Sequence, residues 1–175
     1  MTVATGSFRK MNGQRVIVTG ATSGIGKEIA RGLVQGGASV AIVGRNPAKL
    51  AATVDELGGG AGSAAAAPRV KIDTYTADLS ELTAVRALAA ELHVRESHIN
   101  VLVNNAGINL GGGAPTSDGY DPMLATNYLS PWLLTNLVLD LLAAGRPARI
   151  VNVASEAHRI ADRIDPAHLT TFDTT

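Results

Sequence analysis

Short apolar runs rich in β-branched residues alternate along this chain with longer segments in which apolar residues recur at helical spacing. Short runs bounded by turn residues are typical of buried strands, and the 3.6-residue period is typical of helices packed on one face. The predicted strands cover residues 15–19, 39–43, 70–76, 100–103 and 149–153. The predicted helices cover residues 24–35, 47–57, 81–95 and roughly 121–142.

The strict alternation of strands and helices predicts a parallel sheet. Parallel neighbours need crossover connections, and right-handed helical crossovers place helices on both faces of the sheet. We therefore expect an α/β fold, a doubly wound parallel sheet in three layers. A run of Gly and Ala at residues 58–68 interrupts the alternation and is predicted to be a surface loop.

The first predicted strand leads into a glycine-rich turn, TGATSGIG at residues 19–26, and then into a helix. A helix that begins near Gly24 leaves its first N–H groups unpaired and carries a partial positive charge there, so backbone groups can hold a pyrophosphate. A glycine at position 24 lets the backbone approach a phosphate, and Gly26 allows the helix to pack closely on the sheet. The turn therefore predicts dinucleotide binding.

Other interpretations of this turn differ in what they require. A Walker A loop needs glycine where Ala21 stands and Ser or Thr where Glu28 stands. The glycines are spaced G-x-x-x-G-x-G, so the G-x-G-x-x-G pattern of most dinucleotide enzymes is not matched literally either. An ordinary β–α turn that binds nothing stays open on this motif alone.

The predicted strands all end in small, polar or charged residues. In an open parallel sheet, ligands bind at the carboxyl ends of the strands, where the strand order reverses. The ends read Thr19-Gly20, Gly44-Arg45, Ala77-Asp78, NNAG at residues 104–107, and Ala154-Ser155. Their convergence at one edge of the sheet predicts a binding site.

Composition narrows the class of partner. The 175 residues, 46% of them apolar, suit one α/β domain, and 15 acidic residues balance 15 basic ones without a block of like charge. This balance argues against nucleic acid or an anionic membrane as a partner, and small molecules are expected. The chain has no cysteine, and its four histidines lack metal-ligand spacing, so we predict no metal site.

The distribution of apolar and polar residues along the chain predicts where the protein resides. Residues 1–13 are polar and contain no apolar core of signal-peptide length. The longest mostly apolar stretch, residues 123–144, is interrupted by Asn127, Pro131 and Asp140, which favours a buried soluble helix over a membrane span. We expect cytoplasmic residence and no membrane partner.

Two motifs resemble the short-chain dehydrogenase/reductase family: the T-G-x-x-x-G-x-G turn at residues 19–26 and the NNAG at residues 104–107. Asp78-Leu79, Asn127 within NYLSP, and Ser155 at the end of IVNVAS also fit. The resemblance covers nearly the whole chain from Arg15, and residues 127–158 are most similar to the branch containing retinol dehydrogenases. It implies a Rossmann-type dinucleotide-binding domain at residues 15–155, after an extension at 1–14 and before an incomplete substrate-side loop at 156–175.

The resemblance also implies a set of cofactor-binding residues. Asp78 would hydrogen-bond the adenine ring, and Asn105 to Gly107 would line the adenosine and ribose path. Structural roles stay open beside these, because Asp78 can cap the next helix and Asn105 can join neighbouring strand ends. The full set is Gly20, Thr22, Ser23, Gly24, Ile25, Gly26, Arg45, Asp78, Leu79, Asn105, Ala106 and Gly107.

Arg45 bears on the choice between NADP(H) and NAD(H). An acidic residue about twenty positions beyond the glycines would accept from the ribose 2′-hydroxyl of NAD, whereas a basic residue there suits the 2′-phosphate of NADP. This chain has Arg45 and no carboxylate at that place. The sequence therefore favours NADP(H), with a merely solvated arginine as the alternative.

The catalytic set implied by the resemblance is incomplete in this sequence. Ser155 would hydrogen-bond the substrate oxygen and Asn127 would take part in a proton relay. The family also uses a Y-x-x-x-K pair, in which the lysine lowers the tyrosine pKa from about 10. No tyrosine here is followed by lysine at that spacing. We expect a C-terminally truncated chain, a fragment or one of two polypeptides, that lacks the C-terminal helices and strands of the family.

Our functional prediction is an NADP(H)-dependent oxidoreductase that transfers a hydride between nicotinamide and a carbonyl or alcohol substrate. The alternative is a non-catalytic nucleotide-binding or interaction chain that keeps only the cofactor-binding half, and the missing Y-x-x-x-K favours it. A Rossmann-like domain without a ligand ranks last, because the polar strand ends would be coincidental. The resemblance implies a homo-oligomer or association with the missing C-terminal part. The substrate itself is not predicted.

Overall fold

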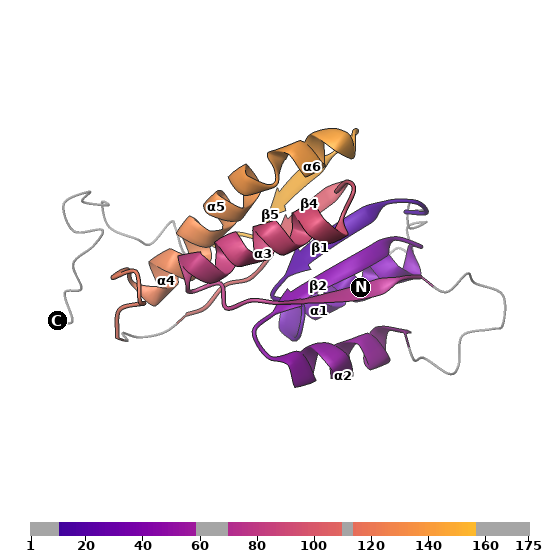
Figure 1. The fold of residues 1–175 in the computed structure, drawn as a ribbon. Coiled ribbons are helices and arrows are strands. Elements are labelled where there is room, and N and C mark those ends of the chain that lie inside the picture. Colours follow the sequence, from indigo (N-terminus) through magenta and orange to yellow (C-terminus); the bar gives the residue numbers. More distant parts are fainter. Residues whose placement is uncertain (1–10, 59–69, 110–113, 157–175) are drawn as a thin grey trace.

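The strands form one five-stranded parallel sheet in a computed structural model that describes residues 11–58, 70–109 and 114–156 (Figure 1). The strand order is β3-β2-β1-β4-β5, and each neighbouring pair is parallel. All predicted strands are present within two residues of their predicted ends. Their bounds are β1 Arg15–Thr19, β2 Ser39–Gly44, β3 Ile72–Thr76, β4 Val101–Asn104 and β5 Arg149–Asn152.

The first three helices lie where the sequence predicts them. They are α1 (Gly24–Gln35), α2 (Pro47–Gly58) and α3 (Leu82–Arg95). Asn46 caps α2, because its Oδ1 accepts from the N–H of Lys49 at 3.0 Å. Gly58 belongs to α2 rather than to the predicted loop, and the remainder of that loop lies outside the described residues.

The single helix predicted over residues 121–142 is wrong: the segment is divided into four elements. They are α4 (Pro122–Leu124), the π-helix η1 (Ala125–Leu129), α5 (Ser130–Leu137) and α6 (Leu139–Ala144). Pro131 has no N–H for the carbonyl four residues earlier, which favours a change of hydrogen-bond register just before it. Val138, with φ −114° and ψ 18°, separates α5 from α6. No helix in the described ranges is both long and apolar enough to span a membrane.

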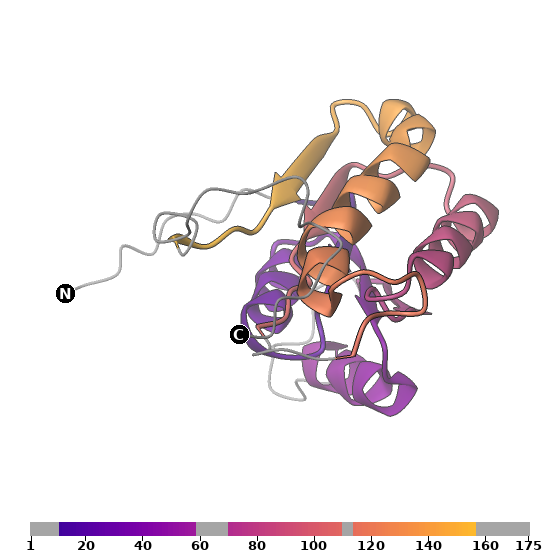
Figure 2. The ribbon, with the colours of Figure 1, turned by 90° about the vertical axis from the view of Figure 1, so that its left-hand side faces the viewer.

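Two hydrophobic clusters on opposite faces of the sheet establish the predicted three-layer architecture. Val16, Val18 and Ile42 pack toward α1 and α2, whereas Ile17 and Leu102 pack toward α3, α5 and α6. The alternation along β1 sends successive side chains to opposite faces, as a strand covered on both sides requires. Figure 2 shows the helices on both sides of the sheet.

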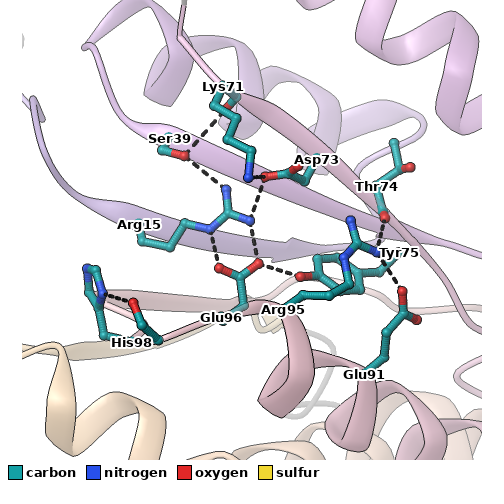
Figure 3. A network of polar contacts seen from close by, with 11 residues as sticks. Arg15, Ser39, Lys71, Asp73, Thr74, Tyr75, Glu91, Arg95, Glu96 and His98 are labelled. Carbon is teal, nitrogen blue, oxygen red and sulfur yellow. Dashed lines mark hydrogen bonds and ion pairs between the residues drawn. The ribbon is translucent and has the colours of Figure 1, made fainter.

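A buried polar network joins the strands at their amino ends, away from the predicted ligand edge (Figure 3). The Arg15 guanidinium donates from Nε to Glu96 Oε2 at 2.8 Å and from Nη1 to Ser39 Oγ at 2.9 Å, and its Nη2 pairs with Asp73 at 2.8 Å. Tyr75 donates its hydroxyl to Glu96. Burial and this bond to Glu96 raise the pKa of Tyr75. The network therefore ties β1, β2 and β3 to the end of α3.

Candidate functional site

The turn after β1 brings the start of α1 so close to the sheet that there is no room for a side chain at position 26. A Cβ on Gly26 would lie 2.3 Å from Asn105 Nδ2 and 2.4 Å from the carbonyl oxygen of Gly20. Gly20 itself has a φ of +66°, in the left-handed region that glycine adopts readily. In the described part of the chain, the N-cap residue Ser23 makes no side-chain capping bond to α1. The first N–H groups of α1 are therefore available to an anion.

Asn105 joins the ends of β1 and β4. Its Nδ2 donates to the carbonyl oxygens of Thr19 and Gly20 at 2.9 and 3.3 Å. The Thr19 hydroxyl accepts from the backbone N–H of Asn105 and of Ala106, both at 3.0 Å, and donates to Val103 at 3.3 Å. The structural role considered for Asn105 is thus present. It holds Ala106 and the rest of the NNAG turn beside the glycine turn.

Asp78 orders the turn between β3 and α3. Its Oδ1 accepts from the Ser80 N–H at 3.0 Å and from the Ser80 hydroxyl at 2.7 Å. Burial alone would raise the pKa of Asp78, but the two bonds from Ser80 and the positive charge of Arg45 outweigh it and lower that pKa. Asp78 is therefore a carboxylate at neutral pH, within the electrostatic reach of the exposed Arg45.

Two side chains from residues 114–130 also contact the turn between β3 and α3. The Ser130 hydroxyl donates to the Leu79 carbonyl, and Asp118 Oδ2 accepts from the Leu82 N–H at 2.9 Å. Asp118 thus caps α3 from 36 positions away, while the N-cap residue Glu81 makes no such bond to the helix within the described chain. The sequence carries no local signal for these contacts, and neither Asp118 nor Ser130 was predicted.

Asn127 lies in the π-helix η1 and is fastened to the NNAG loop. Its Oδ1 accepts from the Ile108 N–H and its Nδ2 donates to the Ile108 carbonyl, both at 2.9 Å. Single π-helical turns are frequent at functional sites. Ser155 follows β5 and is exposed. Asn127 therefore lies in a helix, and Ser155 lies in the segment after β5, the strand that pairs with β4.

Two adjoining clefts lie at the carboxyl ends of the strands. Every residue predicted to bind the cofactor lines the first, which has a volume of about 640 Å³. Asn127 and Ser155 line the second, of about 1180 Å³, and Ile25 and residues 105–108 border both. Gly44 and Ala77, which the sequence predicts only as strand ends at the site, also line the first cleft. Sequence reasoning missed its other lining residues, which are Val43, Ser80, Ile108, Pro122 and Thr126.

The first cleft lies where the chain winding reverses, since β1 has β2 on one side and β4 on the other. A parallel sheet with this order and a glycine turn at the switch point defines a dinucleotide-binding Rossmann fold. A family profile described as short chain dehydrogenase matches residues 14–163. The chain belongs to this family, as the sequence motifs predict.

Relatives and solved structures of the family agree with this assignment. The chain is 36% identical to human retinol dehydrogenase 12 over 158 residues, covering 86% of this chain and 46% of that protein. Against retinol dehydrogenase 13 of Mus musculus the identity is 37%, over 87% of this chain and 44% of the relative. The chain therefore spans less than half the length of these curated relatives.

Among solved structures, the Pseudomonas aeruginosa RhlG/NADP active-site complex matches with a TM-score of 0.73 and 29% identity, over 93% of this chain and 62% of that chain. A metagenomic short-chain oxidoreductase in complex with NADP matches with a TM-score of 0.70 and 32% identity, over 85% of this chain and 64% of that chain.

Proposed function

We propose that this chain forms the cofactor-binding half, and part of the catalytic site, of an NADP(H)-dependent oxidoreductase acting on a carbonyl or alcohol substrate. The observation that carries the proposal is the first cleft, which all the predicted cofactor-binding residues line. When bound, the nicotinamide supplies the hydride that is exchanged with the substrate carbon. The residues of this chain bind the nucleotide, orient the substrate oxygen and hold part of the proton path.

The adenosine side of the cofactor would bind between Asp78 and the NNAG turn. Ser80 occupies Asp78 Oδ1 with two bonds, so Oδ2 is the oxygen that accepts from the exocyclic amine of adenine. The lowered pKa of Asp78 keeps this acceptor ionised at neutral pH. The uncapped first turn of α1 would hold the pyrophosphate through its N–H groups.

Arg45 would select NADP(H) over NAD(H). It lies directly after β2, is exposed, and lines the first cleft near Asp78. Its planar guanidinium can make two parallel charge-assisted bonds to a 2′-phosphate, whereas the 2′-hydroxyl of NAD offers it no charge. The NADP complexes among the structural neighbours support this preference.

The substrate would lie in the second cleft, with its oxygen on Ser155. Asn127 would serve the proton relay implied by the resemblance while its side chain remains fixed on Ile108. The sequence contains no Y-x-x-x-K pair, so we propose that these 175 residues bind the cofactor but do not turn over substrate without a tyrosine and lysine supplied in addition. The second candidate is a nucleotide-binding chain without redox activity.

Titration of the purified chain with NADPH and with NADH, followed by nicotinamide fluorescence, tests the proposal. We expect tighter binding of NADPH, and R45A to weaken it about 10- to 100-fold with little change for NADH, since charge-assisted bonds to a phosphate are lost. K49A is the matched control, because Lys49 is an exposed cation on α2 that lines neither cleft. Binding of neither cofactor would contradict the proposal. Binding without turnover after a tyrosine- and lysine-bearing segment is supplied would favour the second candidate.

A further inference from the structure

Two buried polar atoms near the candidate site lack a hydrogen-bond partner among the described residues. They are Oδ1 of Asn104, at the end of β4, and Oγ1 of Thr126, in η1. Each residue is only 6% exposed. A buried hydroxyl or amide oxygen without a partner is costly, and most such atoms in folded proteins are satisfied by protein or by ordered water. Both atoms therefore need a hydrogen-bond partner.

Asn104 and Thr126 line the same internal cavity. It has a volume of about 10 Å³ and lies between the end of β4 and the start of α5. The Asn104 Nδ2 donates to Thr135 Oγ1 at 3.1 Å and to Asn152 Oδ1 at 2.9 Å. The other wall residues are Thr19, Leu79, Ala106, Ser130, Pro131 and Leu134.

The size and chemistry of the cavity select its occupant. About 10–15 Å³ is the space that one water molecule needs, and a buried water requires two to four polar partners. Asn104 Oδ1 can only accept, the Thr126 hydroxyl can donate, and Ser130 Oγ, which donates to Leu79, retains lone pairs. No wall residue carries a charge, so an ion has no counter-charge there. An apolar occupant would leave both oxygens unsatisfied.

We propose that this cavity binds a single structural water, which accepts from Thr126 and donates to Asn104 Oδ1 and Ser130 Oγ. The water would link the end of β4 to η1 at the residue directly before Asn127. Asn127 in turn holds Ile108, at the border of both clefts. The water and Thr126 would thus position the loop of the candidate site.

Crystal structures of the wild-type chain, T126S and T126V at a resolution that orders buried waters test the proposal directly. Wild type and T126S should show a water within about 2.7–3.2 Å of both oxygens. T126V, which is isosteric but has no hydroxyl, should lose or displace it. A dry cavity in the wild type would overturn the proposal, as would a Thr126 hydroxyl that instead donates to the backbone carbonyl of residue 122. The wild-type structure decides even if T126V fails to fold.

Amide hydrogen exchange at Ile108 tests the positioning role in solution. Its N–H donates to Asn127 Oδ1, so a loosened η1 should expose it. We expect T126V to accelerate this exchange by about tenfold and T126S by less than about twofold. The control is T53V: Thr53 is 2% exposed, lies in α2, and donates its hydroxyl to the Lys49 carbonyl at 2.7 Å. Equal exchange at Ile108 in T126V and T53V would refute the positioning role.

Discussion

The centre of the sheet and its β5 edge are packed very differently. Every residue of β1 is buried, whereas every residue of β5 is exposed, although both strands pair with β4. Val103 and Val151 are partners in the same register, yet Val103 is 4% exposed and Val151 42%. In Figure 2, β5 stands at the margin of the fold, away from α1 and α2. The described helices thus bury β1, at the first cleft, on both faces. By contrast, β5, which leads to Ser155, is exposed and is held along the edge where it pairs with β4.

The polar network at the amino end of the well-packed strands should give the largest effect. The side chains of Arg15 and Glu96 are each 8% exposed, so E96A leaves a buried arginine with only part of its counter-charge. Breaking a buried pair usually costs about 3–5 kcal/mol. Because Asp73 still pairs with Arg15, we expect a loss of about 3 kcal/mol in the free energy of unfolding, measured in urea.

The control for this prediction is E91A, which removes an exposed pair. Glu91 contacts Arg95 and its side chain is 43% exposed. Exposed ion pairs contribute less than about 1 kcal/mol, so E91A should change stability little. Equal losses for E96A and E91A would mean that the network does not hold the strands together.

Val103 and Val151 allow a direct test of the packing difference. V103A removes buried apolar volume beneath α1 and should cost about 2 kcal/mol. V151A removes the same atoms from an exposed neighbour and should cost less than about 0.5 kcal/mol. Thermal or urea unfolding measures both. A loss of about 2 kcal/mol for V151A would show that β5 is covered in solution by something beyond the described residues.

The packing difference also marks what the sequence could predict. The strands, α1 and the polar strand ends follow from local patterns, because Val and Ile runs, helical periodicity and glycine turns act over a few residues. The amino-acid sequence alone therefore predicts that the glycine turn and Asp78 lie at the same edge of the sheet, and both line the first cleft. The family motifs added Asn127 and Ser155 to the neighbouring cleft, although their catalytic roles stay predictions.

Contacts between distant segments could not be predicted. Ser130 reaches Leu79 across 51 positions, and a serine at the start of a helix has no pattern that names such a partner. The division of the long helix was also missed, since the apolar period continues through the π turn while only Pro131 signals the change of register. The unpartnered oxygen of Thr126 could not be predicted either, because residues distant along the chain form the cavity that it lines.

Asp118 connects the segment before α4 to the start of α3, and its removal should have a moderate effect on stability. Its carboxylate caps α3 by accepting from the Leu82 N–H, so D118A should lower the free energy of unfolding by about 1 kcal/mol. Hydrogen exchange at the Leu82 amide should accelerate with it. D121A is the matched control in the same segment, because Asp121 Oδ1 accepts instead from the Leu124 N–H at 2.8 Å. If Leu82 exchanged no faster in D118A than in D121A, the tether would not exist in solution.

The smallest effect concerns His93, which links α3 to α6 on the surface. Its Nδ1 contacts the Ala89 carbonyl at 2.8 Å and its Nε2 contacts Asp140 at 3.0 Å, and in that order these contacts raise the pKa of His93 above its ordinary value of 6.5. A histidine whose pKa is higher in the folded than in the unfolded state stabilises the fold when it is protonated. This contribution is complete below pH 6.5 and is lost as the pH rises through the folded-state pKa. Between about pH 6 and 8, the melting temperature of wild type should therefore fall more than that of H93Q or D140N. Parallel curves for all three proteins would mean that the surface pair contributes nothing, as many exposed pairs do.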